Sequence, residues 1–277
     1  MTPRLAYFAV FLLLPAVSQA EPDRIAVTRS AASGPWSNPA TWEGGKVPAA
    51  GANVLIRSGH VVVYDRDSDD AIRSVHISGT LRFDPTKDTR LAVGLIRIQA
   101  GESVSDEGFE CDAHIEEPDP RKPKPALEIG TPEQPIPPAR RATIRLVYFE
   151  GTDRNSWPAI VYCADRLDIH GAPLGRTWVK LGADAKAGES RVKLAEPAAG
   201  WKAGDRIIVT GTKNPDDTRG KFSTEEFTIK QIEGDSITLD RPLEFAHLGS
   251  GEFRGEVANL SRNVVIESAD PAKARGH

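Results

Sequence analysis

Short runs of apolar residues recur along the chain, and each is followed within a few residues by Gly, Asp or Pro. Helical periodicity is almost absent. The runs are rich in Val and Ile and include residues 54–56, 61–63, 75–77, 95–98, 142–146, 160–162, 207–209, 236–239 and 264–266. Many short strands separated by turn residues predict an all-β protein.

The composition of the runs helps to choose between all-β architectures. Several are uninterrupted apolar triplets, such as Val54–Ile56 and Val61–Val63. Half-exposed strands alternate apolar and polar residues, whereas strands covered on both faces do not. Gly, Asn and Asp at the ends of runs supply the sharp corners that a stacked solenoid needs. The pattern therefore favours a solenoid without a strict repeat, with a β-sandwich-like module plus a β domain as the alternative.

The first twenty residues have the pattern of a secretory signal peptide. Arg4 precedes an apolar stretch from Leu5 to Val17, and Ser18 to Ala20 supplies the small residues that a signal peptidase recognises. No later segment is apolar enough to cross a membrane. We expect a mature protein that begins near Glu21 and is secreted.

The net charge of the chain bears on the kind of partner it binds. A net charge of −4 and a pI near 5.9 give no electrostatic case for nucleic-acid binding.

Cys111 and Cys163 are the only cysteines, and an exported chain can join them in a disulfide; two unpaired thiols are the alternative. The sequence holds no Cys/His cluster, so neither a metal nor another cofactor is expected.

The region between residues 36 and 151 resembles a known extracellular module. It reads WSNPATWEGGKVPAAGANVLI, then RSGHVVVYD, VHISGTLRFD and GLIRIQAGE, and then ALEIGTPEQPI and ATIRL. In the order of its tryptophans, glycines and strands it resembles the G8 domain, which is named for its glycines. The matching glycines are Gly45, Gly51, Gly59, Gly79, Gly94, Gly101 and Gly130.

Residues 152–277 extend the resemblance through LDIHGAPLGRTWVKL, WKAGDRIIVTGT and HLGSGEFRGEVANLSRNVVIES. They are similar to the region around the G8 domain in the family of cell-migration-inducing and hyaluronan-binding protein, transmembrane protein 2 and fibrocystin. The resemblance implies the start of an irregular right-handed parallel β-helix, which family members continue beyond this point. We therefore expect this chain to be a fragment.

Two tryptophans stand six positions apart at the start of this region, at Trp36 and Trp42. We expect them to cover the open end of the first coil, because each ring buries a large apolar area. Stacking of the two rings on sugars is the alternative.

Cleavage of a glycosidic bond generally uses two carboxylates, one on each side of the bond. The candidates are Glu225 and Glu226, with Asp205 at a turn and Glu256 before LSRN. Adjacent strand residues point to opposite faces, so at most one of Glu225 and Glu226 is expected in a given cleft. Solvated carboxylates at strand ends are the alternative interpretation.

Three other side chains complete the predicted ligand-binding set with Glu226. His170 and His247 both lie beside glycines at expected turns, where a histidine contacts a sugar hydroxyl or fixes the turn. Arg262 in LSRN is suited to bind a uronate carboxylate, or else to cap strand carbonyls.

The acidic turn at Asp65, Asp67, Asp69 and Asp70 does not match a calcium-binding loop. Its sixth position is Asp70 rather than Gly, and its twelfth is His76 rather than Glu. We expect a solvated turn.

The sequence therefore favours a secreted module that binds extracellular polysaccharide, with glycosaminoglycans among the candidates. A depolymerase of hyaluronidase type and a structural or adhesive surface module are the alternatives. An enzyme would place two carboxylates about 5 to 9.5 Å apart in one cleft. The acidic pI weakens a simple electrostatic attraction for a polyanion, so neutral glycans stay open.

Overall fold

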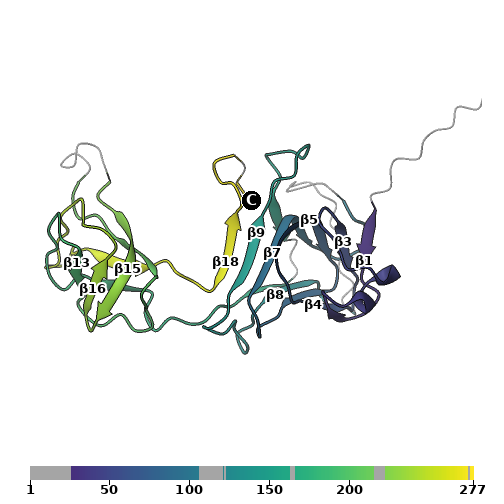
Figure 1. The fold of residues 1–277 in the computed structure, drawn as a ribbon, viewed down its shortest axis with the longest axis horizontal. Coiled ribbons are helices and arrows are strands. Elements are labelled where there is room, and N and C mark those ends of the chain that lie inside the picture. The colour runs from purple at the N-terminus through teal and green to yellow at the C-terminus, as the bar shows by residue number, and fades with distance from the viewer. Residues whose placement is uncertain (1–25, 106–120, 122, 163–165, 215–221, 274) are drawn as a thin grey trace, which may run out of the picture.

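The computed structural model describes residues 26–105, 121, 123–162, 166–214, 222–273 and 275–277 (Figure 1). Within these ranges the regular elements are strands, together with two single-turn 3₁₀ helices, η1 (Pro39–Thr41) and η2 (Glu43–Gly45). The prediction of an all-β protein is confirmed. The predicted signal peptide and both cysteines, Cys111 and Cys163, lie outside the described residues.

Two parallel sheets form one part of the molecule, which we call the parallel unit. Successive strands alternate between the sheets, so each coil of chain contributes one strand to each. The first sheet contains β1 (Val27–Arg29), β3 (Asn53–Ile56), β5 (Asp67–Ile77), β7 (Thr89–Ile98), β9 (Ala142–Leu146) and β18 (Val264–Ser268), with β10 (Ala159–Tyr162) beside β7. The second contains β2 (Gly34–Pro35), β4 (Val61–Tyr64), β6 (Thr80–Phe83), β8 (Ala126–Ile129) and β11 (Arg166–Ile169).

The apolar triplets form the core between these sheets. The parallel register stacks equivalent residues of successive coils above one another, so apolar columns run along the unit. Two columns are Val54, Val75 and Ile96 in the first sheet and Val62, Leu81 and Leu127 in the second, all fully buried. Burial on this scale is the main stabilising contribution, at about 25 cal/mol per Å² of apolar surface.

The two tryptophans at the start of the unit are buried, as predicted. Trp36 and Trp42 are 1% and 2% exposed and pack edge to face, with ring centroids 4.9 Å apart. The indole N–H of Trp42 donates to the carbonyl of Trp36 at 2.8 Å. Sugar stacking needs an exposed ring face, so this pair does not provide it.

Residues 176–260 form a second part, which we call the antiparallel module. Its strands are β12 (Trp178–Lys180), β13 (Arg191–Lys193), β14 (Arg206–Val209), β15 (Glu225–Glu233), β16 (Ser236–Leu239) and β17 (Glu256–Asn259). They are ordered β12-β17-β14-β15-β16-β13, and a bridge between Leu181 and Leu194 brings the two outer strands together. The sheet is thus half closed around its own core.

The antiparallel pairing follows from local turns. Gly234 and Asp235 connect β15 to β16, and Gly234 has a φ of 61°. A two-residue turn of this kind returns the chain beside the strand it has just left. The start of a β-helix is predicted for residues 152–277. In the structure β10, β11 and β18 join the parallel sheets, whereas the strands between Trp178 and Asn259 pair antiparallel with one another.

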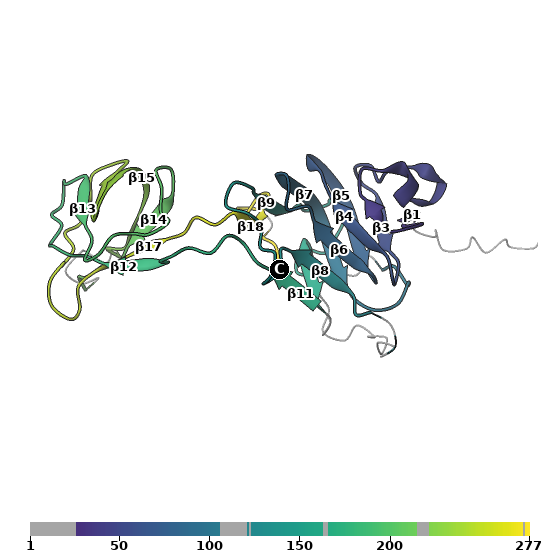
Figure 2. The same cartoon turned by 90° about the horizontal axis from the view of Figure 1, so that it is seen from below.

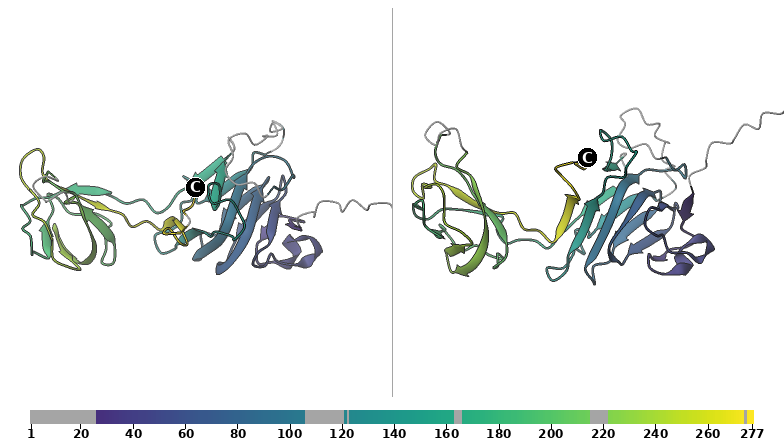
Figure 3. Two further views of the ribbon diagram at one scale, coloured as in Figure 1. Left: turned by 90° about the horizontal axis from the view of Figure 1, so that it is seen from above. Right: turned by 45° about the horizontal axis from the view of Figure 1, so that its top comes forward.

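Two segments connect the parts, residues 170–177 on the way out and residues 260–263 on the way back (Figures 1 and 2). Further views show the same arrangement, with the antiparallel module lying to one side of the parallel unit (Figure 3). Among the described residues no helix is long and apolar enough to cross a bilayer.

The buried histidine of β5 makes stability depend on pH. His76 is 4% exposed, and its Nδ1 has no hydrogen-bond partner among the residues that the structure describes. Burial lowers the pKa of His76 from 6.5 to about 4, with a smaller contribution from the positive charge of Arg97. Between these values the unfolded chain binds a proton that the native chain does not, so a fall in pH favours unfolding. We expect this to cost about 3 kcal/mol at pH 4.

The measurement is urea unfolding of the wild type and His76→Gln between pH 7 and pH 4. Glutamine removes the titrating group, so the stability of the variant is expected to fall less steeply over this range. Equal slopes for the two proteins would show that His76 does not couple folding to pH.

Candidate functional site

A cleft of about 500 Å³ lies where the parallel unit and the antiparallel module join. Both connecting segments line it, through residues 172–174 and 261–263. The loop before β9 lines one side, and the turn before β14 lines the other. The cleft therefore exists only because the chain leaves the parallel unit and returns to it.

Four positively charged side chains surround the cleft: Arg140, Arg141, Lys202 and Arg262. None of the four forms an ion pair with a carboxylate of the described residues. Elsewhere the arginines are commonly paired; Arg57, Arg90 and Arg176, for example, each contact an acidic side chain. A concentration of unpaired cations around a concave surface attracts anionic ligands.

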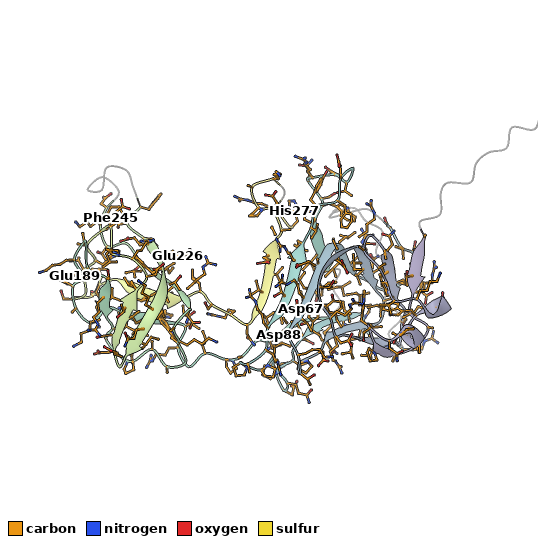
Figure 4. All side chains as sticks on the ribbon, in the orientation of Figure 1. Asp67, Asp88, Glu189, Glu226, Phe245 and His277 are labelled. Atoms are coloured by element: carbon orange, nitrogen blue, oxygen red, sulfur yellow. The ribbon has the colours of Figure 1, made fainter. Side chains whose placement is uncertain are left out.

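The two carboxylates that line the cleft accept hydrogen bonds from backbone N–H groups instead of pairing with the four cations. Asp88 Oδ1 accepts the backbone N–H of Arg141 at 3.0 Å. Asp205 is 5% exposed, and its Oδ2 accepts the N–H of Lys202 at 3.0 Å and the amide of Asn259 at 2.8 Å. Asp88 belongs to the parallel unit, where it is labelled in Figure 4. Each carboxylate thus fixes the backbone of a residue whose side chain lines the cleft.

Asn263 ties the connecting segments to the loop that carries Arg140. Its Nδ2 donates to the carbonyls of Ile136, Pro137 and Arg140 at 2.9–3.0 Å. Its Oδ1 accepts the N–H of Ala172 at 2.8 Å. One half-buried amide therefore sets the position of three walls of the cleft.

Arg262, predicted from the sequence as a ligand residue, lines the cleft and also caps backbone. Its Nη1 donates to the carbonyls of Asn259 at 2.9 Å and Ser261 at 2.6 Å. These bonds fix one edge of the guanidinium group. Its other donors have no partner among the described residues, so they are available to a ligand.

Glu225 and Glu226 point to opposite faces of β15, as predicted. Glu226 is exposed and pairs with Arg206, whose Nε lies 2.7 Å from Glu226 Oε1. Glu225 is 7% exposed, and its carboxylate accepts the N–H groups of Glu244 at 2.8 Å and Phe245 at 3.1 Å. The solvated interpretation fits Glu226, but it is wrong for Glu225.

His247 is enclosed in the antiparallel module beside Glu225. Its Nδ1 lies 2.9 Å from the carbonyl of Thr210, and its Nε2 lies 3.0 Å from Glu225 Oε2. Both of these partners belong to the antiparallel module itself, so His247 links Thr210 to Glu225 inside the module, and we do not include it in the ligand site.

The remaining sequence candidates lie elsewhere. His170 is half-buried at a corner of the parallel unit, where its backbone bonds to Ile129 and Ile136. Glu256 is half-buried in β17. The expected acidic turn is instead the start of β5, where the side chains of Asp67 and Asp69 are exposed to solvent, as expected, and pair with Arg90.

Of the four cations that line the cleft, Arg262 is among the candidates predicted from the sequence, whereas Arg140, Arg141 and Lys202 are not. The doublet in PPARRATIRL stands directly before an apolar run, where a strand-end cation is ordinary. A signal did exist, because two adjacent arginines follow two prolines without a nearby acidic residue. Their convergence with Lys202 depends on the return of β18 to the sheet.

A family model supplies the decisive comparison. The model described as the G8 domain matches residues 41–182, which is more than half of the 277 residues. The chain belongs to the G8 domain family. The match begins at Thr41, covers β3 to β11 of the parallel unit, and ends at Gly182, just after β12, the first strand of the antiparallel module.

Relatives of this G8 protein are longer than the chain itself. Human fibrocystin-L is 30% identical over 250 residues, which cover 85% of this chain and 5% of the relative. Mouse fibrocystin is 27% identical over 266 residues, which cover 87% of this chain and 6% of the relative. The chain therefore spans a small part of the length of the relatives it matches.

Solved structures give weaker likenesses. The tailspike of Pseudomonas phage phi297 has a TM-score of 0.28 and 10% identity, covering 78% of this chain and 23% of that one. The tailspike of Acinetobacter baumannii phage AP22, solved with a capsular saccharide, has a TM-score of 0.28 and 8% identity, covering 78% and 24%.

Proposed function

We propose that this G8 protein binds an extracellular polysaccharide that carries carboxylate or sulfate groups, and that the cationic cleft is its binding site. The observation that supports the proposal is the set of unpaired cations at Arg140, Arg141, Lys202 and Arg262. The predicted signal peptide favours a ligand outside the cytoplasm.

The chemistry of the cleft favours an anion over a neutral sugar. A guanidinium group binds a carboxylate with two parallel hydrogen bonds, and three of the four cations are arginines. The net charge of −4 does not oppose this, because attraction depends on the local field of a cleft. The bound segment is expected to place an acidic group among these side chains.

Binding is favoured over cleavage by the state of the cleft carboxylates. A glycosidase needs one carboxyl group to donate a proton and another to attack or activate water. Asp88 and Asp205 both line the cleft, but each accepts backbone N–H groups that fix the walls. We therefore propose a binding module rather than a depolymerase.

We further infer that the parallel unit is an irregular right-handed β-helix. The alternation of strands between two parallel sheets supports this, because connections between parallel strands are right-handed in nearly all proteins. The antiparallel module is then an insertion into the helix before β18.

Removing the cations of the cleft is the test of the proposed function. The triple variant Arg140→Gln, Arg141→Gln and Lys202→Gln spares Arg262, which also caps backbone. We expect it to weaken binding of a hyaluronan decasaccharide at least about tenfold, since each lost charged hydrogen bond costs about 1.5 kcal/mol or more. Titration calorimetry at low and high salt measures this, and wild-type binding is expected to weaken as salt rises.

A matched variant removes the same charge elsewhere. Lys46, Lys186 and Lys230 are exposed and lie outside the cleft, and we expect their triple change to glutamine to leave affinity nearly unchanged. Equal losses in both variants would mean that the chain attracts polyanions without a specific site. Full affinity in the cleft variant would contradict the proposal.

A further inference from the structure

One tryptophan differs from all the others in its exposure. The chain has five tryptophans, and all lie among the described residues. Trp36, Trp42, Trp157 and Trp201 are 1–7% exposed, whereas Trp178 is 49% exposed. An indole is the side chain that gains most from burial, so one left half in solvent on a rigid strand is available for a ligand.

Strand register places Trp178 on the outer face of the antiparallel sheet. Trp178 lies opposite Ala258, Ala258 opposite Ile208, and Ile208 opposite Glu226. Directly opposed residues share a face, so the four form one row across β12, β17, β14 and β15. The neighbour of the indole in this row is alanine, and its small side chain leaves the surface beside the ring open.

A groove of about 520 Å³ runs along Trp178. Arg254 lines it, and its Nε is buried with no hydrogen-bond partner in the described part of the chain. Lys180 and the ion pair of Arg176 with Glu196 also line it. An aromatic face beside the charged side chains of Arg254 and Lys180 is a combination that a polar ring fits and a purely apolar ligand does not.

The backbone segment that leads into Trp178 is held in place by a hydrogen bond and by close packing. The indole N–H of Trp201 donates to the carbonyl of Arg176 at 2.7 Å. At Gly175 an added Cβ would lie 3.2 Å from the Cβ of Ala199, so the chain passes close to its neighbour there. The segment that leads into Trp178 is therefore fixed before any ligand arrives, which reduces the entropy lost on binding.

The groove and the cationic cleft are neighbours, because Leu174 lines both. From Leu174 the connecting segment leads on one side to the cleft and on the other to Gly175 and Trp178. The cleft and the groove therefore adjoin at Leu174, which places both within reach of one linear polymer.

We propose that the groove is a second sugar subsite, in which a pyranose ring stacks on the exposed face of Trp178 and a hydroxyl or carboxylate of the sugar accepts from Arg254. The subsite rests on the proposed function, because it extends the path of the same polysaccharide beyond the cleft. C–H groups on one face of a pyranose ring match the flat apolar face of an indole, and its equatorial hydroxyls reach the polar rim.

A second copy of the chain is the other occupant to consider. A stable protein interface buries about 1,000 Å² or more of contiguous surface. The groove instead offers one ring among Arg176, Lys180, Glu196 and Arg254. This surface suits one sugar residue, and self-association is an outcome that the test must detect.

The test uses the full mature chain, Trp178→Ala and Trp178→Phe, with hyaluronan tetrasaccharide and decasaccharide and a neutral cello-oligosaccharide as probes. Acrylamide quenching of tryptophan fluorescence reports Trp178, because the other four indoles are buried. We expect the decasaccharide to protect wild type from quenching. We also expect Trp178→Ala to lower decasaccharide affinity about tenfold, with Trp178→Phe intermediate and tetrasaccharide binding in the cleft unchanged.

The outcomes separate the subsite from the proposed function. Full decasaccharide affinity in Trp178→Ala, with loss in the cleft variant, would overturn the subsite and leave the proposed function intact. If the neutral cello-oligosaccharide alone protected Trp178 from quenching, the subsite would be supported and the proposal that the ligand is acidic would be overturned. No protection by any probe, or self-association in sedimentation that Trp178→Ala abolishes, would overturn the subsite.

Discussion

Replacing Glu225 with alanine is expected to destabilise the antiparallel module by about 3–5 kcal/mol. The carboxylate accepts N–H groups from Glu244 and Phe245 and lies 3.0 Å from Nε2 of His247, whose side chain is fully buried. Removing it leaves a buried imidazole nitrogen and two backbone N–H donors without their partner, and each buried polar group left unsatisfied costs about 1–3 kcal/mol.

The neighbouring residue supplies the control. Glu226→Ala removes an exposed carboxylate from the same strand and breaks its pair with Arg206. Exposed pairs contribute about 0–1 kcal/mol, so we expect little change in stability. Hydrogen exchange measured by peptide locates the effect: Glu225→Ala is expected to lose protection in residues 176–260 and to retain it in the parallel unit. Similar losses in the two variants would contradict the role of the buried pair.

Replacing Gly79 with alanine is expected to cost about 3 kcal/mol or more. An added Cβ would lie 2.2 Å from the carbonyl oxygen of Arg57 and 2.4 Å from that of His60. Both are backbone atoms of the corner of the preceding coil, and that corner is bonded to the Gly79 corner, since Thr80 N–H donates to the His60 carbonyl at 2.8 Å. Relief of the overlap therefore requires two coils to separate.

Gly59→Ala separates this overlap from ordinary backbone strain. Gly59 belongs to the same corner and has a φ of 82°, but an added Cβ there meets no atom within 4 Å. Its substitution is expected to cost about 1–2 kcal/mol, the usual penalty of the left-handed conformation. Urea unfolding of both variants measures the difference. A smaller loss in Gly79→Ala than in Gly59→Ala would mean that the coils are not packed as described.

The sequence by itself was enough to predict the strands of the parallel unit and the family to which the chain belongs. Apolar triplets such as Val54–Ile56 and corner glycines such as Gly79 are local patterns, and each acts where it stands in the chain. The burial of Trp36 and Trp42 followed from the same reasoning, because two large rings before the first coil have an open core end to cover. Arg262 could be named as a candidate because the residue type and its chemistry are both visible in the sequence.

Tertiary structure decided the rest. In the sequence, the strands of the antiparallel module are apolar runs like those of the parallel unit. Only the turns between them distinguish them from further coils of that unit. Burial of Glu225 depends on His247, which lies 22 residues away. Arg140 and Lys202 line the same cleft because β18, which lies more than a hundred residues after β9 in the sequence, pairs beside β9 in the sheet. The local sequence pattern shows which side chains are apolar or charged. Long-range strand pairing fixes which of them share a cleft, and no local period encodes that pairing.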